Sequence, residues 1–486
     1  MRQVTNKAAS SGLRSKTMLV AHSVLSKPSS GGNSIPGRLH LEWIVDILSR
    51  HKAAASAVFA LGVKASGALL TIVIFALAGR AMSADDFGRL AVWFNAVSLL
   101  AVAAVVGQDT LIMRSWGEYN GRGQYAVARC AYRFGWRVTV ASGLAFAAAL
   151  FFAARLVYAN VSWAMALACA AFLFTQTLLH YSSHSSRVLV GFVTSEINRE
   201  LTWRLVLLGA VTWAIVYGGV TPTQFFFGGV IGMLLSLAFQ SVAVRRKLAS
   251  GPVAAPADFD GAGWLIIARS MWLSAIVEAI SQYADVMLVG YFVSPADAGA
   301  YFVAARIANI FTMVTTGLHT YSLTHSAALF FSNQHQKLQA ILRSLAIVSL
   351  AFLLPAVIVI VVAGSDILMV LGTRHESAYP ILIVLTLACF ARALCGPASG
   401  ILLTTGHERL YSRVVVFATA ARILLTAFLA SQFGGLGAAV GWAIGNVPLA
   451  ICLALICRAV CGVDPSVAAI PLWRKEAATS VTGAGA

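Results

Sequence analysis

Apolar runs of about 18 or more residues recur along the chain and alternate with short polar connections. A helix of that length crosses the hydrocarbon core of a bilayer. The pattern therefore predicts an all-α polytopic membrane protein with about twelve transmembrane helices. We place the spans near residues 55–79, 90–113, 138–154, 161–179, 201–217, 222–243, 264–293, 300–323, 344–363, 380–404, 411–431 and 435–457.

A ten-residue pattern occurs twice, each time after the first span of a six-span half. Residues 79–88 read GRAMSADDFG and residues 290–299 read GYFVSPADAG. The aligned identities, at a constant offset of 211, are Gly79, Ser83, Asp86 and Gly88 with Gly290, Ser294, Asp297 and Gly299. Six spans separate the copies, so both turns lie on the same side of the membrane. This predicts two lobes that are parallel repeats about an axis along the membrane normal.

The repeat predicts the domain organisation. We expect a cytoplasmic basic tail with a short amphipathic helix at 41–48, two six-helix lobes, a cytoplasmic linker between them and a cytoplasmic C-terminal tail. The corresponding ranges are 1–54, 55–243, 244–263, 264–457 and 458–486. The helix at 41–48 either lies on the membrane surface or leads as an exposed helix into the bundle.

The charge distribution predicts the orientation. The formal net charge is +17, yet 59% of residues are hydrophobic and only 11% are charged, which excludes a soluble globular protein. Of the 35 Lys and Arg, the odd-numbered connections hold only Arg80, Arg89, Arg155 and Arg374, when span-edge residues such as Arg204 are counted with the adjoining connections. By the positive-inside rule both termini are cytoplasmic. The positive charge then needs no nucleic acid partner.

No motif for catalysis or metal binding stands out in the chain. The seven cysteines show no CxxC pair, no Cys/His metal spacing and no disulfide framework. There is no nucleophile elbow and no phosphate-binding glycine loop. A membrane glycan polymerase or ligase usually needs a sizeable external loop to hold its reacting sugars, and the outward connections predicted here are too short to form one. The sequence therefore predicts no cofactor, no metal and no enzymatic activity, and a function within the membrane.

Four basic residues lie inside predicted spans: Lys64, Arg306, Arg392 and Arg422. An intramembrane charge costs about 2.5–3.5 kcal/mol even on lenient scales, so each is a functional candidate. Arg392 and Arg422 each lie fifteen residues from His407, and neither span has an acid near that depth. We expect them to receive an anion in a cavity, or else to face apart and bond polar groups.

Lys64 is the basic residue that the first span offers, and Gly67 and Thr71 follow on the same helical face. Two interpretations are open. The ammonium group faces a cavity, or it extends along the helix to reach the cytoplasmic surface.

Acidic and amide side chains form one face of span 264–293: Glu278, Gln282 and Asp285. The next span carries Arg306 and Asn309 on one face, and Asp285 and Arg306 lie at similar depth across the connecting turn at 294–299. We expect an Asp285–Arg306 pair that acts as a gate or as a structural lock. Glu278, Asp285, Gln282 and Asn309 are the candidates for coupling or gating.

Several stretches resemble the polysaccharide transporter family of the MOP flippase superfamily. They are FALAGRAMSADDFGRL, GQDTLIMR, ADVMLVGYFVSPADAGAYFVAARIA, VLGTRHESAYPILIVLTLA and GGLGAAVGWAIG. The resemblance implies a two-lobed, MATE-like protein of the bacterial inner membrane that alternates between inward-open and outward-open states. Members of the family translocate undecaprenyl-pyrophosphate-linked oligosaccharide repeat units for O-antigen or exopolysaccharide assembly. Basic residues of the first span and central cavity are proposed head-group contacts in related flippases, and Lys64 is similar in position.

The leading hypothesis is a flippase for a lipid-linked oligosaccharide, with Lys64, Arg306, Arg392 and Arg422 as head-group contacts. Its partners would be that substrate, membrane lipids, a polysaccharide polymerase and a chain-length regulator. The first alternative is a cation-coupled multidrug exporter of the same superfamily. The second is a membrane enzyme of glycan assembly.

Overall fold

The chain folds into α-helices joined by short turns, in a computed structural model that describes residues 62–157, 161–249, 259–371 and 378–470. No strand occurs within these ranges. In chain order the helices are a first helix (Gly62–Ala81), α2 (Ala84–Ala104), α3 (Gln108–Gly121), α4 (Tyr125–Val157), α5 (Trp163–Leu189), α6 (Phe192–Ile197), the π-helical turn η1 (Asn198–Thr202), α7 (Trp203–Val216), α8 (Pro222–Ala249), α9 (Gly261–Phe292), α10 (Pro295–Phe331), α11 (His335–Val370), α12 (Ala378–Leu394), α13 (Ala398–Thr404), α14 (Glu408–Cys461) and the 3-10 turn η2 (Val467–Ala469). The basic tail with its helix at 41–48 lies outside the described residues.

These helices confirm an all-α polytopic membrane protein. Eight helices in the described ranges are long and apolar enough to cross a bilayer, and nine if α12 and α13 are one bent span. α14 has 54 residues, and its backbone leaves the helical region at Gly434, where φ is +66°. At about 1.5 Å per residue α14 is far longer than one crossing needs, so Gly434 divides it into two helices.

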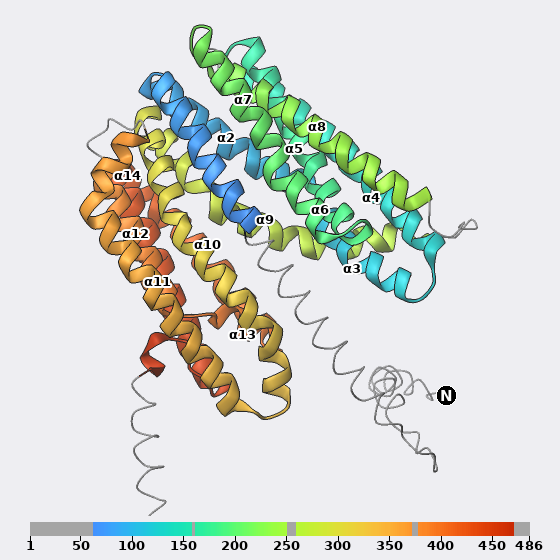
Figure 1. Ribbon diagram of the computed structural model, residues 1–486, viewed down its shortest axis with the longest axis vertical. Helices are drawn as coiled ribbons and strands as arrows, with labels where there is room; N and C mark the ends of the chain where they lie inside the picture. Colours follow the sequence, from blue (N-terminus) through green and yellow to red (C-terminus); the bar gives the residue numbers. More distant parts are fainter. Residues whose placement is uncertain (1–61, 158–160, 250–258, 372–377, 471–486) are drawn as a thin grey trace, which may run out of the picture. The chain divides into compact units, whose positions relative to one another are not determined.

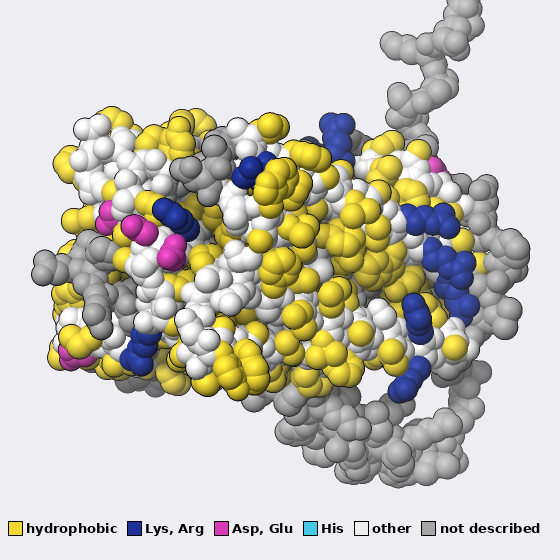
Figure 2. Space-filling model, turned by 90° about the horizontal axis from the view of Figure 1, so that it is seen from above, with side chains coloured by type: hydrophobic (Ala, Val, Ile, Leu, Met, Phe, Trp, Pro, Cys, Tyr) yellow, Lys and Arg dark blue, Asp and Glu magenta, His cyan; other side chains and the backbone are white. Residues whose placement is uncertain are grey.

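Large apolar side chains cover the outside of the bundle. Leu156 is 83% exposed, and Val362 and Phe417 are each 77% exposed. Figure 2 shows apolar side chains over much of the visible surface, with basic side chains most numerous toward one end and fewer elsewhere. A water-soluble surface does not expose so many large apolar groups, whereas a lipid-facing surface does.

The predicted turn at 294–299 is shorter than expected. α9 ends at Phe292 and α10 begins at Pro295, so only Val293 and Ser294 connect them. The reason is local: Ser294 caps the new helix through its side chain, and proline is favoured at the first helical position.

The internal repeat recurs in atomic detail. Ser83 Oγ accepts a hydrogen bond from Asp86 N at 3.1 Å, and Ser294 Oγ accepts one from Asp297 N at 3.1 Å. Each serine hydroxyl also donates to the aspartate, at 2.8 and 2.6 Å respectively. The aligned Ser and Asp positions thus form the same helix N-cap in both halves.

The two repeated turns meet each other. A Cβ on Gly88 would lie 1.7 Å from Pro295 O, and a Cβ on Gly299 would lie 3.2 Å from Gly88 Cα. Only glycine permits this approach of backbone to backbone. We call the end of the bundle that carries the turns Met82–Ser83 and Val293–Ser294 the turn end.

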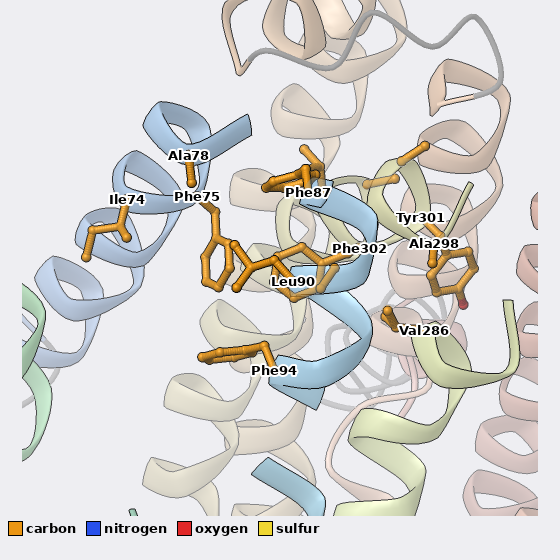
Figure 3. Close-up of a cluster of buried hydrophobic side chains, with 14 of the residues drawn as sticks. Ile74, Phe75, Ala78, Phe87, Leu90, Phe94, Val286, Ala298, Tyr301 and Phe302 are labelled. Atoms are coloured by element: carbon orange, nitrogen blue, oxygen red, sulfur yellow. The ribbon is translucent and has the colours of Figure 1, made fainter. Parts of the chain in front are cut away.

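An aromatic cluster lies next to this glycine contact. The ring of Phe75 packs edge-on against Phe302 with centroids 4.7 Å apart, and against Phe94 at 5.1 Å. Phe87 joins them at 6.4 Å from Phe302. Figure 3 shows these side chains converging from the first helix, α2 and α10. The cluster closes the space between the helices directly below the turns.

The arrangement of helices follows from these contacts. In Figure 1, α3 to α8 lie together on one side and α10 to α14 on the other. α2 packs against α9 and α10, while α9 also packs against α14 and α3. α9 fits against a break between α2 and α3, where Val106 and Gly107 have φ of +53° and +69° and a Cβ on Gly107 would lie 2.6 Å from Ala268 O.

Candidate functional site

A cluster of charged side chains lies where the first helix approaches η1 and α7. Arg204, in the first turn of α7, donates from Nε to Thr71 Oγ1 of the first helix at 2.8 Å. Its Nη1 donates to Glu200 O at 2.5 Å and to Glu200 Oε2 at 2.9 Å. The π-helical turn that holds Glu200 directly precedes α7, and such turns are frequent at functional sites.

Glu200 lies between two guanidinium groups and the first helix. Besides Arg204, it contacts Arg199, whose Nε is 3.6 Å from Glu200 Oε1. A Cβ on Gly67 would lie 3.0 Å from Glu200 Oε2 and 3.2 Å from Glu200 O. Gly67 therefore permits a close approach of the first helix to this carboxylate.

Arg306 of α10 completes the cluster. Its guanidinium lies over the rings of Phe302, 4.8 Å from the centroid, and of Phe94, 5.7 Å away. It is within electrostatic range of Arg204 and of the Tyr283 hydroxyl, and Tyr283 is in turn within range of Arg199 and Arg204. η1, α7, α9 and α10 thus bring the guanidinium groups of Arg199, Arg204 and Arg306 around the Tyr283 phenol, and two of these groups also contact the Glu200 carboxylate.

Counted in residues along the helices, the cluster would lie near the middle of a bilayer. Thr71, Arg204, Tyr283 and Arg306 are between 9 and 12 residues from the turn-end termini of their helices. At about 1.5 Å per residue this is about 14–18 Å, half the thickness of the hydrocarbon core.

A cavity adjoins Arg306. Its walls are formed by the first helix and α10 and by a residue that follows α11: Ile72, Phe75, Ala76, Phe302, Val303, Arg306, Ile307 and Leu371. All of these except Arg306 are apolar. The cavity therefore combines apolar walls with one guanidinium group.

The predicted residues divide into those that line this region and those that do not. Lys64 is exposed, and it lies on the face of the first helix whose Gly67 and Thr71 contact Glu200 and Arg204. Glu278, Gln282 and Asn309 are also exposed. Glu278 is within electrostatic range of Tyr283, at the edge of the cluster.

The prediction of an Asp285–Arg306 pair is wrong. Asp285 pairs instead with Arg422 of α14, whose Nη1 lies 2.7 Å from Asp285 Oδ1. Arg422 Nη2 also donates to Ser281 O at 3.3 Å, and the side chain fits against Gly445, where a Cβ would lie 2.3 Å from Arg422 Cγ. Similar depth does not ensure contact: Asp285 faces α14, whereas Arg306 faces the first helix and α2.

The predicted anion site between Arg392 and Arg422 is also wrong. Arg422 is 2% exposed and already neutralised by Asp285. Arg392 lies over the ring of Trp442 instead, 5.8 Å from its centroid. The absence of acids from their own two spans was misleading, because the acid that neutralises Arg422 comes from α9. In this structure Asp285 is consequently not free to bind a coupling cation.

The sequence reasoning missed Arg199, Glu200, Arg204 and Tyr283. The sequence places Arg204 at the edge of a short predicted span, where it counts with a connection. The helical structure in fact continues back through η1 and α6 to Phe192, so Arg204 is inside the bundle. The available signal was the Glu200–Arg204 spacing of four residues, which places an acid and a base on one helical face.

Comparison with known proteins agrees with this architecture. Residues 271–428 match the MatE family model. An inward-facing multidrug resistance MATE family transporter superposes with a TM-score of 0.70 at 12% identity, over 84% of this chain and 98% of that protein. The described helices therefore share the fold of that transporter. The lipid II flippase MurJ, in an inward closed conformation, has a TM-score of 0.64 at 13% identity over 82% of this chain and 86% of that protein.

A curated relative is similar in sequence over part of its length. The probable flippase AglR of Haloferax volcanii is 25% identical over 272 residues, which are 53% of this chain and 55% of the relative. The match therefore spans about half of that protein.

Proposed function

We propose that the protein is a flippase that translocates undecaprenyl-pyrophosphate-linked oligosaccharide repeat units across the bacterial inner membrane for surface polysaccharide synthesis. The observation that carries this proposal is the gathering of Arg199, Arg204 and Arg306 at mid-membrane depth. Guanidinium groups bind phosphate oxygens through paired hydrogen bonds. The similarity to the probable flippase AglR supports a flippase activity.

The surroundings of Arg306 suit the two parts of such a substrate. The guanidinium offers a contact for the diphosphate, and the neighbouring side chains of Ile72, Phe75 and Ile307 are apolar, as is an isoprenoid chain. Lys64, on the Thr71 face of the first helix, adds a further positive charge near the same region.

The structure is closed at the turn end, where Gly88 contacts Pro295. The closed turn end and the charge cluster adjoin each other. Thr71 and Phe75 lie one turn apart on the first helix, as do Phe302 and Arg306 on α10, and the two Phe rings pack together. Export toward the turn end therefore requires the Phe75–Phe302 contact and the glycine contact to separate. With both termini cytoplasmic, as proposed from the charge pattern, the turn end is periplasmic.

The test uses a strain that lacks the gene. Such a strain should lose surface polysaccharide and accumulate lipid-linked repeat units, measured by mass spectrometry of extracted lipids. Wild-type protein should restore export, and Arg204→Gln and Arg306→Gln should restore little of it. Arg122→Gln, which removes an exposed guanidinium paired with Glu118, should restore it fully. Normal polysaccharide without accumulated intermediates in the deletion strain would refute the proposal.

A multidrug exporter is the second candidate, favoured by the MatE match and the MATE superposition. It would require a site for cationic compounds. The excess of guanidinium groups over carboxylates around Tyr283 argues against such a site. Unchanged drug accumulation in the deletion strain, alongside lost polysaccharide, would separate the two functions. A polymerase and a chain-length regulator are the proposed partners in the pathway.

A further inference from the structure

The structure assigns Glu200 a role that the proposed function leaves unexplained. We infer that Glu200 is a built-in counter-anion, which occupies the guanidinium groups of Arg199 and Arg204 and so excludes singly charged phospholipids until a diphosphate displaces it. This inference rests on the proposed function, since it concerns selectivity at the same cluster.

The Glu200 carboxylate occupies the position between Arg199 and Arg204 that a bound anion would take. One oxygen of Glu200 lies 2.9 Å from Arg204 Nη1, and the other lies 3.6 Å from Arg199 Nε. The side chain is 16% exposed, so it is largely shielded from competing ions. Gly67 of the first helix lies beside it, where a Cβ would be 3.0 Å from Glu200 Oε2.

The need for such a group follows from the location. A bare cluster of guanidinium groups in the membrane would attract anionic phospholipids such as phosphatidylglycerol, which has one negative charge. A tethered carboxylate competes at an effective concentration in the millimolar range or above. A phosphodiester has the same charge as Glu200 and gains nothing by replacing it. A diphosphate has more charge and can extend toward Arg306, which is within electrostatic range of Arg204, so it can displace Glu200.

The displacement would also act on the first helix. Arg204 holds Thr71 through Nε while it holds Glu200 through Nη1. A ligand that draws the guanidinium toward itself therefore weakens both contacts together. Arrival of the correct anion would release the first helix from α7, whereas a singly charged lipid would leave it attached.

The experiment measures lipid selectivity in purified protein. The full chain, in a neutral detergent, is titrated with dioleoylphosphatidylglycerol and separately with undecaprenyl diphosphate, and bound lipid is counted by native mass spectrometry. Glu200→Gln keeps the shape and removes the charge. The matched control is Glu118→Gln, because Glu118 forms an exposed pair with Arg122 at the same four-residue spacing and 3.0 Å.

Glu200→Gln should bind phosphatidylglycerol at least about tenfold more tightly than wild type, whereas Glu118→Gln should not change. The gain should disappear in Glu200→Gln combined with Arg204→Gln, which locates it at the cluster. Equal phosphatidylglycerol affinity in wild type and Glu200→Gln would overturn the inference. If Glu200→Gln does not fold, Glu200→Asp, which withdraws the carboxylate from Arg204, should show a smaller gain, and no gain would overturn the inference.

Failure of the proposed function is a separate result. Wild-type protein that binds no undecaprenyl diphosphate would refute that function, while the phosphatidylglycerol comparison would still report whether Glu200 excludes singly charged lipids.

Discussion

Removal of one partner from the Asp285–Arg422 pair should be strongly destabilising, and the two single variants should differ in their response to pH. The carboxylate and guanidinium groups are 8% and 2% exposed, 2.7 Å apart. In Asp285→Asn, Arg422 keeps its contact with Ser281 O, and its Nε has no acceptor among the described residues. In Arg422→Met, the Asp285 carboxylate loses its partner.

The loss of stability in each variant depends on whether the remaining group can lose its charge. An unpaired buried charge costs about 3–5 kcal/mol. Arginine cannot lose its proton, so the cost in Asp285→Asn should not depend on pH. An aspartate can take up a proton, at a cost of about 4 kcal/mol at pH 7 for an ordinary carboxyl group, and this cost falls by about 1.4 kcal/mol for each unit of lower pH. Arg422→Met should therefore regain stability as the pH falls.

The assay is thermal unfolding of the detergent-solubilised protein, followed by tryptophan fluorescence at pH 7.5 and pH 5.5. Both single variants should unfold at clearly lower temperatures than wild type at pH 7.5. At pH 5.5 the deficit of Arg422→Met should shrink and that of Asp285→Asn should persist. The double variant Asp285→Asn/Arg422→Met should lie close to wild type at both values, because it leaves no buried charge.

The exposed Arg122→Met supplies the control, because a surface pair contributes only about 0–1 kcal/mol. The reasoning would be refuted if the double variant were as unstable as the sum of the singles. It would also fail if Arg422→Met showed no dependence on pH.

Three further outcomes are expected at close contacts. Gly88→Ala should insert normally but lose most export, because its Cβ would lie 1.7 Å from Pro295 O and the turns could not close; full export at wild-type protein levels would contradict this. Ser294→Ala should lower the unfolding temperature through the loss of about 1 kcal/mol of N-cap stabilisation, and an unchanged melting curve would count against the cap. Gly445→Ala should cost about 1–3 kcal/mol by crowding the Arg422 side chain, measured by the same melts, and wild-type stability would show that the side chain can yield.

The fold was accessible from the sequence because its signals are local. Long apolar runs predict spans without knowledge of their neighbours, and each predicted span overlaps a helix of the structure. The repeat was readable for the same reason, since Ser83 and Ser294 cap the residues three positions later. Helix ends were less accessible. The apolar pattern does not predict the break at Val106 and Gly107, because this break depends on contact with α9, which is distant in the sequence.

The candidate site was less accessible because it depends on which helix faces which. Depth counting placed Asp285 and Arg306 at one level, but it contains no information on rotation about the helix axis. Asp285 accepts a hydrogen bond from Arg422 on α14, 137 residues away. Arg204 donates one to Thr71 on the first helix, 133 residues away. Contacts of this separation are decided by the packing of whole helices, which a single sequence does not reveal.

The position of the charge cluster relative to the closed end suggests how binding and opening are connected. Arg204 holds Thr71, and one turn further along the first helix Phe75 packs against Phe302. Arg306 lies over that same Phe302 ring. An anion that draws in both arginines therefore acts on both sides of the Phe75–Phe302 contact, on one side through the first helix and on the other through α10. Since this contact lies between the cluster and the glycine turns, the groups proposed to bind the substrate are also those best placed to loosen the closure that blocks its exit.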